Sequence, residues 1–144
     1  LLVFIEPGTP SGFSSIRRVR EQLLLRGVNI IAPCPHNNSC PIAEYDWCHF
    51  SQRLARSQLH RQIKGGTLSY EDEKFSFVCL SRIPGGEVKG VVLRHPQIRK
   101  GHIYLTLCTL NGIENIKVTK REKEKFKEAR KLEWGAVVRK DSLV

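Results

Sequence analysis

The side chains best suited to chemistry in this sequence are cysteines. Cys34, Cys40 and Cys48 lie in one proline- and asparagine-rich stretch, and Cys79 follows later, which gives a C-x5-C-x7-C-x30-C spacing. Four thiolates can bind a zinc ion or an iron–sulfur cluster. A loop with so few apolar residues also needs a linkage of this kind to hold its shape. The spacing therefore predicts a four-cysteine metal site.

The spacing leaves the identity of the bound group open. Structural zinc sites commonly use cysteine pairs two to four residues apart, and the chain has no such pair. The wider spacing favours a [4Fe–4S] cluster, whose ligands lie farther apart than those of one ion, while zinc or no metal at all remain alternatives. His36 and His49 are alternative ligands, although a surface or supporting role is the simpler interpretation. Cys108, in an apolar stretch, is expected to pack as a small hydrophobic residue.

Nothing in the sequence predicts a catalytic residue, because no cysteine–histidine pair with an orienting third group is present. The 24 lysines and arginines against 14 acids give a net charge of +10. Such an excess favours a polyanionic partner such as nucleic acid, with a merely basic surface as the alternative. No apolar run approaches the roughly 20 residues of a membrane span, so no membrane partner is expected. The odd cysteine count, without a signal peptide, favours a reducing compartment over a disulfide framework.

The first third of the chain predicts a strand, a helix and a second strand. Residues 1–5 form a continuous apolar run, typical of a strand covered on both faces in a parallel sheet. Apolar residues from Phe13 to Leu23 recur at helical spacing, Gly27 ends that helix, and residues 28–32 form the next strand. In such units the loops after the strands form the ligand crevice. The cysteine stretch follows the second of these strands, so we expect it to lie at the edge of the sheet where ligands bind.

Two basic stretches are candidates for contact with phosphate groups. A helix is expected over residues 47–64, with Asp46 as its N-cap and Gly65 as its end, and its cations recur every three or four residues. The second stretch is the loop of residues 94–102, which contains no acid. A solvated helix face is the alternative interpretation of the first stretch. The predicted contact residues are Arg53, Arg56, His60, Arg61, Lys64, Arg94, Arg99 and Lys100.

The remainder of the chain predicts a mainly antiparallel extension. The acids of residues 71–73 form a solvated turn or orient the preceding arginines, and a strand follows over residues 75–83. Strands are expected over residues 88–93, 101–110 and 113–119, with Asn111-Gly112 as a hairpin signal. A charged helix over residues 120–132 closes the chain. We therefore divide the chain into residues 1–83 and 84–144. A start inside an apolar run, and no methionine, lead us to expect the C-terminal fragment of a larger protein.

Several of these stretches together resemble one protein family. The residues A-P-C-P-H, D-W-C-H-F-S-Q-R and Y-E-D-E-K-F-S-F, with the opening L-V-F-I-E-P-G-T-P-S-G-F, resemble the methyltransferase-like proteins of small ribosomal subunit assembly. These occur in bacteria and mitochondria, and the resemblance extends over nearly the whole chain. It implies an α/β fold: the C-terminal half of a Rossmann-like class I methyltransferase fold, with an added antiparallel β extension and a C-terminal helix.

The resemblance also implies a function. It indicates an assembly factor that binds the small ribosomal subunit and its rRNA, in the bacterial cytoplasm or the mitochondrial matrix. Mitochondrial members of the family carry a [4Fe–4S] cluster on four cysteines, which the resemblance places at Cys34, Cys40, Cys48 and Cys79. The glycine-rich turn that would hold S-adenosylmethionine is absent from these 144 residues, so that cofactor is expected only in the intact protein, if at all. The alternatives are an rRNA methyltransferase whose cofactor half is absent here and a zinc-stabilised nucleic-acid-binding module.

Overall fold

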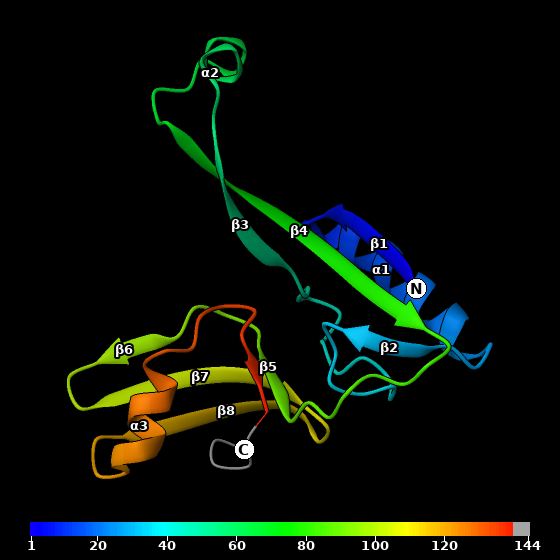
Figure 1. The fold of residues 1–144 in the computed structure, drawn as a ribbon, viewed down its shortest axis with the longest axis vertical. Coiled ribbons are helices and arrows are strands. Elements are labelled where there is room, and N and C mark those ends of the chain that lie inside the picture. Colours follow the sequence, from blue (N-terminus) through cyan, green and yellow to red (C-terminus); the bar gives the residue numbers. More distant parts are fainter. Residues whose placement is uncertain (140–144) are drawn as a thin grey trace.

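The computed structural model describes residues 1–139 and has a mixed α/β fold with two antiparallel sheets. In the first sheet the strand order is β1-β4-β2, and β3 pairs with another part of β4. In the second sheet the order is β6-β7-β5-β9, and β8 pairs with β7. Figure 1 shows the two sheets next to each other and the far end of the β3–β4 hairpin, which carries α2, projecting away from them. The elements are β1 (Leu2–Pro7), α1 (Pro10–Leu24), β2 (Asn29–Ala32), β3 (Phe50–Ala55), α2 (Gln58–Lys64), β4 (Tyr70–Ser81), β5 (Gly90–Val92), β6 (Gln97–Arg99), β7 (His102–Thr109), β8 (Gly112–Thr119), α3 (Lys123–Ala129) and β9 (Val137–Val138).

The predicted strand–helix–strand unit is confirmed as β1, α1 and β2. Thr9 caps α1 by accepting a hydrogen bond from the Gly12 amide, and Pro10 occupies the first turn. Ile16 of α1 packs on Val78 and Leu80 of β4. The strands β1 and β2 run in the same direction, but β4 lies between them and is antiparallel to both. The expected parallel sheet is therefore wrong for these strands, because a later strand separates them.

The burial expected for the first strand is also wrong for the part of the chain that the structure describes. Leu2, Val3 and Ile5 are 46 %, 52 % and 66 % exposed, respectively. The reason is that β1 is an edge strand: its sheet neighbour is β4, and α1 packs against it. No helix of residues 1–139 is long and apolar enough to cross a bilayer.

The helix expected over residues 47–64 is wrong over its first half. Residues 50–55 form β3, which pairs with β4 so that Phe50 lies opposite Phe75 and Arg53 opposite Asp72. Aromatic and charged cross-strand pairs of this kind stabilise a hairpin, and the sequence spacing alone did not reveal them. Only α2 is helical, and it ends as expected at Gly65 in the left-handed conformation. The acids expected in a turn, residues 71–73, lie on β4.

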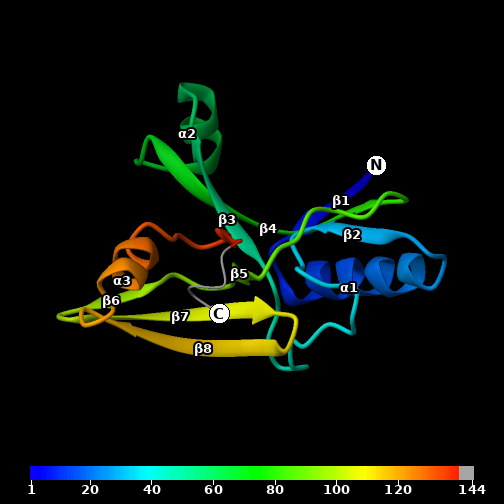
Figure 2. The same ribbon diagram turned by 60° about the horizontal axis from the view of Figure 1, so that its bottom comes forward.

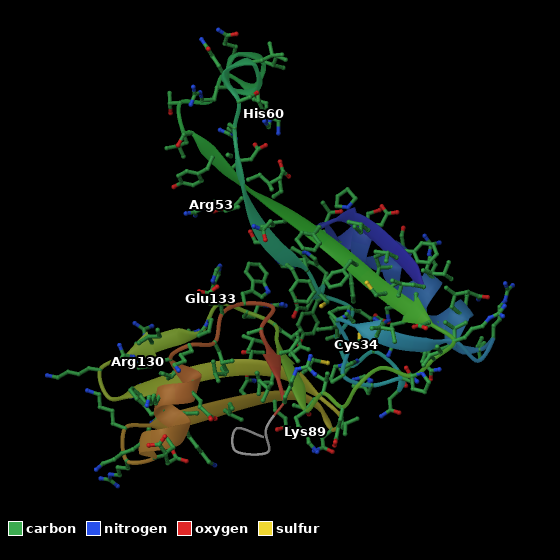
Figure 3. The ribbon with its side chains drawn as sticks, viewed as in Figure 1. Cys34, Arg53, His60, Lys89, Arg130 and Glu133 are labelled. Carbon is green, nitrogen blue, oxygen red and sulfur yellow. The ribbon has the colours of Figure 1, made fainter. Side chains whose placement is uncertain are left out.

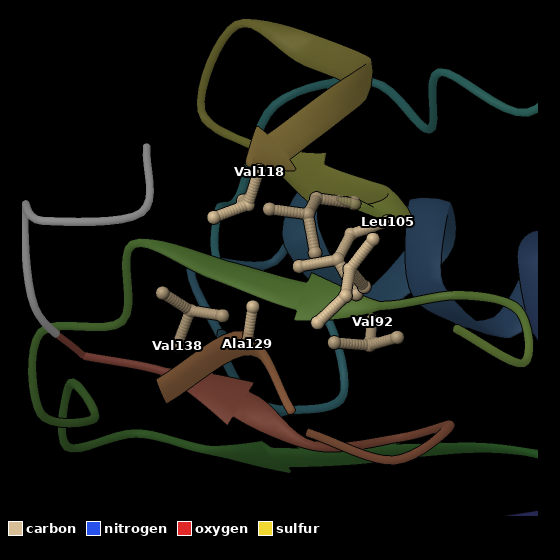
Figure 4. Packing of buried hydrophobic residues seen from close by; sticks show 7 residues of the cluster. Val92, Leu105, Val118, Ala129 and Val138 are labelled. Carbon is tan, nitrogen blue, oxygen red and sulfur yellow. The ribbon is translucent and has the colours of Figure 1, made fainter. Parts of the chain in front are cut away.

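The second sheet confirms most of the expected extension. The Asn111-Gly112 signal is confirmed, because β7 and β8 form a hairpin in which Thr109 lies opposite Gly112. Two short strands were not predicted, β6 inside the basic loop and β9 near residue 138, and α3 is shorter than the helix expected there. Figure 4 shows the core of this sheet, where Val92, Leu105, Val118 and Val138 pack around Ala129 of α3. Residues 140–144 of the second predicted part lie outside the described residues, and the division at residue 83 stays a prediction.

Candidate metal centre and basic surfaces

Four cysteines line one small cavity where the two sheets meet. Cys34 directly follows β2 and Pro33, Cys40 and Cys48 lie in the segment of residues 33–49, which has no helix or strand, and Cys108 lies on β7. The cavity measures about 30 Å³. Figure 3 shows Cys34 at the junction between the sheets. The structure thus brings together three of the four cysteines chosen from the sequence and adds Cys108 as a fourth.

Cys79 is not part of this group. It lies on β4 opposite Val3 and Ala32, and side chains alternate along a strand, so it points away from the face that carries Val78. Val78 lines the cavity, whereas Cys79 does not. Cys108 packs as a buried residue of β7 beside Phe13, Ile42 and Leu93, as the sequence predicted, but its position on the cavity wall was not predicted. Cys108 reaches the cavity only because the second sheet packs against the segment of residues 33–49, and this contact is not visible in the sequence.

The remaining wall of the cavity is mostly apolar. Burial raises the pKa of the Cys34 thiol, and the nearby Arg20 guanidinium opposes this rise. Burial, and then the neighbouring Cys34 and Cys40, raise the pKa of Cys48 far above its usual value, and burial raises the pKa of Cys108 to about 12. With raised pKa values, the thiols of Cys34, Cys48 and Cys108 are protonated at neutral pH, and a metal must displace these protons to bind. The wall is completed by Phe13, Ile16, Arg17, Arg20, Pro33, Pro41, Ile42, Phe50, Ser76, Phe77, Val78, Val91 and Leu93.

Unpartnered buried nitrogens gather at the same place. Within residues 1–139, Nε and Nη1 of Arg20 and Nδ1 of His36 are buried and make no hydrogen bond. The other ring nitrogen of His36, Nε2, lies 3.7 Å from Cys108 Sγ. A buried donor without an acceptor costs free energy, so native proteins rarely leave one unused. Several such atoms beside four thiols fit a site that receives an anionic group.

The second histidine considered as a ligand lies elsewhere. His49 is buried, its Nδ1 is 3.1 Å from the carbonyl oxygen of Trp47, and its ring stacks on the Trp47 indole. Burial lowers the pKa of both His36 and His49. His49 does not line the cavity, so its position is that of a packed aromatic residue.

The arrangement of the thiols constrains what they can bind. In the described part of the chain, no group of three or more Cys, His, Asp or Glu side chains is arranged to hold a metal ion. The four sulfurs surround the cavity without converging on one point. Soft thiolate ligands beside a cation suit zinc or an iron–sulfur cluster.

The predicted cationic stripe is divided between β3 and α2 and is largely neutralised. Glu71 of β4 accepts hydrogen bonds from Arg56 at 2.6 Å and Lys64 at 3.2 Å, and its Oε1 lies 3.0 Å from His60 Nε2. Hydrogen bonding from Arg56, and then from Lys64, lowers the pKa of Glu71 to about 2. Figure 3 shows His60 on the projecting hairpin. These cations therefore hold the hairpin together, as the alternative of acids orienting the arginines suggested.

The other predicted cations divide into paired and unpaired ones. Arg53 forms an ion pair with Asp72 at 2.8 Å, and Arg94 forms one with Asp46 at 2.6 Å. Asp46 therefore bridges to the second sheet and does not cap a helix. Three predicted residues have no ion-pair partner among residues 1–139 and lie in α2 or around the β6–β7 turn: Arg61, Arg99 and Lys100.

Comparison with known proteins agrees with the resemblance in the sequence. Residues 1–139 match the family described as "Mitochondrial small ribosomal subunit Rsm22". The chain belongs to this family. The Rsm22 family assignment confirms the resemblance to small ribosomal subunit assembly proteins drawn from the sequence.

Individual relatives match different shares of the chain. The human "Ribosome assembly protein METTL17, mitochondrial" is 29 % identical to it, over 93 % of this chain and 31 % of the human protein. The fission yeast (Schizosaccharomyces pombe) "Rsm22-cox11 tandem protein 1, mitochondrial" and "Rsm22-cox11 tandem protein 2, mitochondrial" are each 39 % identical, over 57 % of this chain and 13 % of the yeast protein. The chain thus spans less than a third of the length of these relatives.

Proposed function

We propose that this chain is part of a mitochondrial assembly factor of the small ribosomal subunit, which binds rRNA and carries a structural [4Fe–4S] cluster. The Rsm22 family membership supports the ribosomal role, and the human and yeast relatives, which are named as mitochondrial proteins, support the mitochondrial location. We also propose that residues 1–83 belong to a Rossmann-like class I methyltransferase domain, for which the β1–α1–β2 unit is a fitting component.

The observation that carries the cluster proposal is the meeting of four thiols beside unpartnered Arg20 nitrogens. The proposed ligands are Cys34, Cys40, Cys48 and, in place of Cys79, Cys108. Four protein ligands leave no position for a substrate, so the bound group supplies a structural crosslink and not catalysis. The crosslink joins the segment of residues 33–49 to β7 and therefore ties the two sheets together.

We assign the phosphate contacts chiefly to Arg61, Arg99 and Lys100. The other predicted cations are held in ion pairs with residues 46, 71 and 72, so contact with phosphate would require those pairs to break or to be shared. A charge excess of +10 over the whole chain favours the approach of rRNA to either surface.

One alternative has an observation in its favour. Four cysteine thiols on one cavity wall are also the donor set of a structural zinc ion, which supports a zinc-stabilised nucleic-acid-binding module. Methyl transfer to rRNA by the intact protein is an activity that these residues do not carry themselves, because the glycine-rich cofactor turn is absent from them.

The deciding experiment is the metal content of the full-length protein, purified without oxygen. About four iron and four sulfide ions per chain, with a broad absorption band near ~400 nm, are the expected result. One zinc ion per chain without sulfide would contradict the cluster proposal and support the zinc-stabilised module. A protein without bound metal that still binds rRNA tightly would overturn the cluster proposal and leave the ribosomal one standing.

A further inference from the structure

Arg20 is a buried cation without a counter-charge. Its side chain on α1 is only 3 % exposed. Buried arginines are normally paired with a carboxylate, but Arg20 forms no ion pair among residues 1–139. Its Nη2 donates to the carbonyl oxygens of His36, at 3.4 Å, and of Asn38. Its Nε and Nη1 make no hydrogen bond to any described residue.

The unused side of the guanidinium belongs to the wall of the thiol cavity. Arg20 lines that cavity together with Cys34 and Cys108. An uncompensated buried charge is strongly destabilising. The metal-free protein is therefore destabilised by the unpaired charge of Arg20, and an anionic group bound in the cavity would remove this destabilisation.

We infer that Arg20 is the counter-charge of the group bound by the four thiols, with Nε and Nη1 donating hydrogen bonds to its sulfur atoms. This inference rests on the proposed function. Four thiolates give a bound cluster or zinc ion a net negative charge, which a buried guanidinium stabilises. A cluster that takes up one electron becomes more negative, so Arg20 also favours the reduced form and raises the reduction potential. Arg20 is thus a positioning residue that links α1 to the metal centre.

The test compares Arg20→Met with Arg18→Met in the full-length protein. Both changes remove one positive charge from α1, but Arg18 is exposed. In a redox titration under anaerobic conditions, Arg20→Met is expected to make reduction of the cluster at least tenfold less favourable, a shift of about 59 mV to lower potential for one electron. Arg18→Met should leave the potential unchanged, and Arg20→Lys should restore most of it.

Thermal unfolding of the loaded and the chelator-treated protein separates a charge effect from a structural one. Arg20→Met should lower the melting temperature of the loaded protein and leave that of the metal-free protein equal or higher, since an unpaired buried charge is gone. If Arg20→Met does not retain the cluster, this metal-free comparison still decides the question. An equal loss of stability in both states, or the same potential as Arg18→Met, would overturn the inference. A wild-type protein without bound metal would instead overturn the proposed cluster itself.

Discussion

At the scale of single residues, each proposed ligand is held by a different part of the fold. Cys108 is fixed by the register of β7 with its neighbours, and Cys34 by the end of β2. Cys48 has no regular element of its own, but its carbonyl oxygen accepts a hydrogen bond of 2.8 Å from the Ser76 hydroxyl of β4. The site therefore depends on contacts between strands that are far apart in the sequence.

The first prediction concerns the fourth ligand, for which we propose Cys108 in place of Cys79. Cys108→Ser is expected to remove most of the bound iron and sulfide, because it replaces a thiol ligand that lines the cavity. Cys79→Ser should retain both, since Cys79 does not line the cavity. Iron and sulfide analysis of the two variants, each purified without oxygen, measures the difference. Iron loss in Cys79→Ser together with full retention in Cys108→Ser would restore the ligand set implied by the resemblance.

The Ser76 hydroxyl gives a second prediction. Ser76 is almost fully buried, and Ser76→Ala leaves the Cys48 carbonyl without this donor. We expect a loss of about 1 kcal/mol in the free energy of unfolding, measured by urea denaturation of the metal-free protein. Ser15→Ala on α1, where no side-chain hydrogen bond is present in residues 1–139, is the control and should change little. Equal effects of the two changes would show that the hydrogen bond to Cys48 contributes nothing.

At the scale of elements, the β3–α2–β4 hairpin is the part least supported by a core. No residue of α2 is buried, and Figure 2 shows α2 at the end of the hairpin, away from the second sheet. The helix is capped by Ser57 and ended by Gly65, but a helix of this length is not stable by itself. Its fixed position depends on Glu71, which forms ion pairs with Arg56 and Lys64 and lies beside His60.

This dependence makes the order of the hairpin sensitive to acid. Because the pKa of Glu71 is lowered from 4.5 to about 2, first by Arg56, its contribution is complete above about pH 4.5 and is lost as the pH falls towards 2. Amide exchange of residues 58–64, corrected for the intrinsic pH dependence, should lose protection in that range. Glu71→Gln should lack protection already at neutral pH. Glu44→Gln, at an exposed glutamate outside the hairpin, should behave as the wild type.

At the scale of the whole molecule, two sheets with separate cores meet at the thiol cavity. The Arg94–Asp46 ion pair also crosses this junction, and Arg17 of α1 donates a hydrogen bond of 3.3 Å to the Ile42 carbonyl in the segment of residues 33–49. The candidate rRNA contacts lie outside it, with Arg61 on the projecting hairpin and Arg99 and Lys100 on the second sheet. A group bound by the four thiols would therefore fix the distance between the two basic surfaces.

The fourth prediction concerns the binding of rRNA by the full-length protein. Replacing Arg61, Arg99 and Lys100 together by glutamine should weaken binding to small-subunit rRNA. It should also reduce the slope of log K against log salt by about 0.7 for each phosphate group that the variant no longer binds. Fluorescence anisotropy at several salt concentrations measures both effects. The control variant replaces Arg18, Arg26 and Arg82, which are exposed elsewhere, and an equal change in its slope would refute the assignment.

The sequence by itself determined the features that depend on residues near one another in the chain. The strand–helix–strand unit, the end of α2 at Gly65 and the hairpin at Asn111-Gly112 are of this kind, because local backbone preferences specify them. The grouping of Cys34, Cys40 and Cys48 also followed from their closeness in the sequence, and the family from the motifs around them.

Only the tertiary structure decided which distant residues share a site. The cations of residues 53–64 fit a helix by spacing, but pairing of residues 50–55 with β4 outweighed that local preference and gave the cations acidic partners. From the sequence, Cys79 and Cys108 are both expected to lie on strands. Cys79 lies on the face of β4 that points away from the cavity, whereas the packing of the second sheet brings Cys108 close to Cys34 and Arg20. Such choices depend on long-range packing, which a local sequence pattern does not encode.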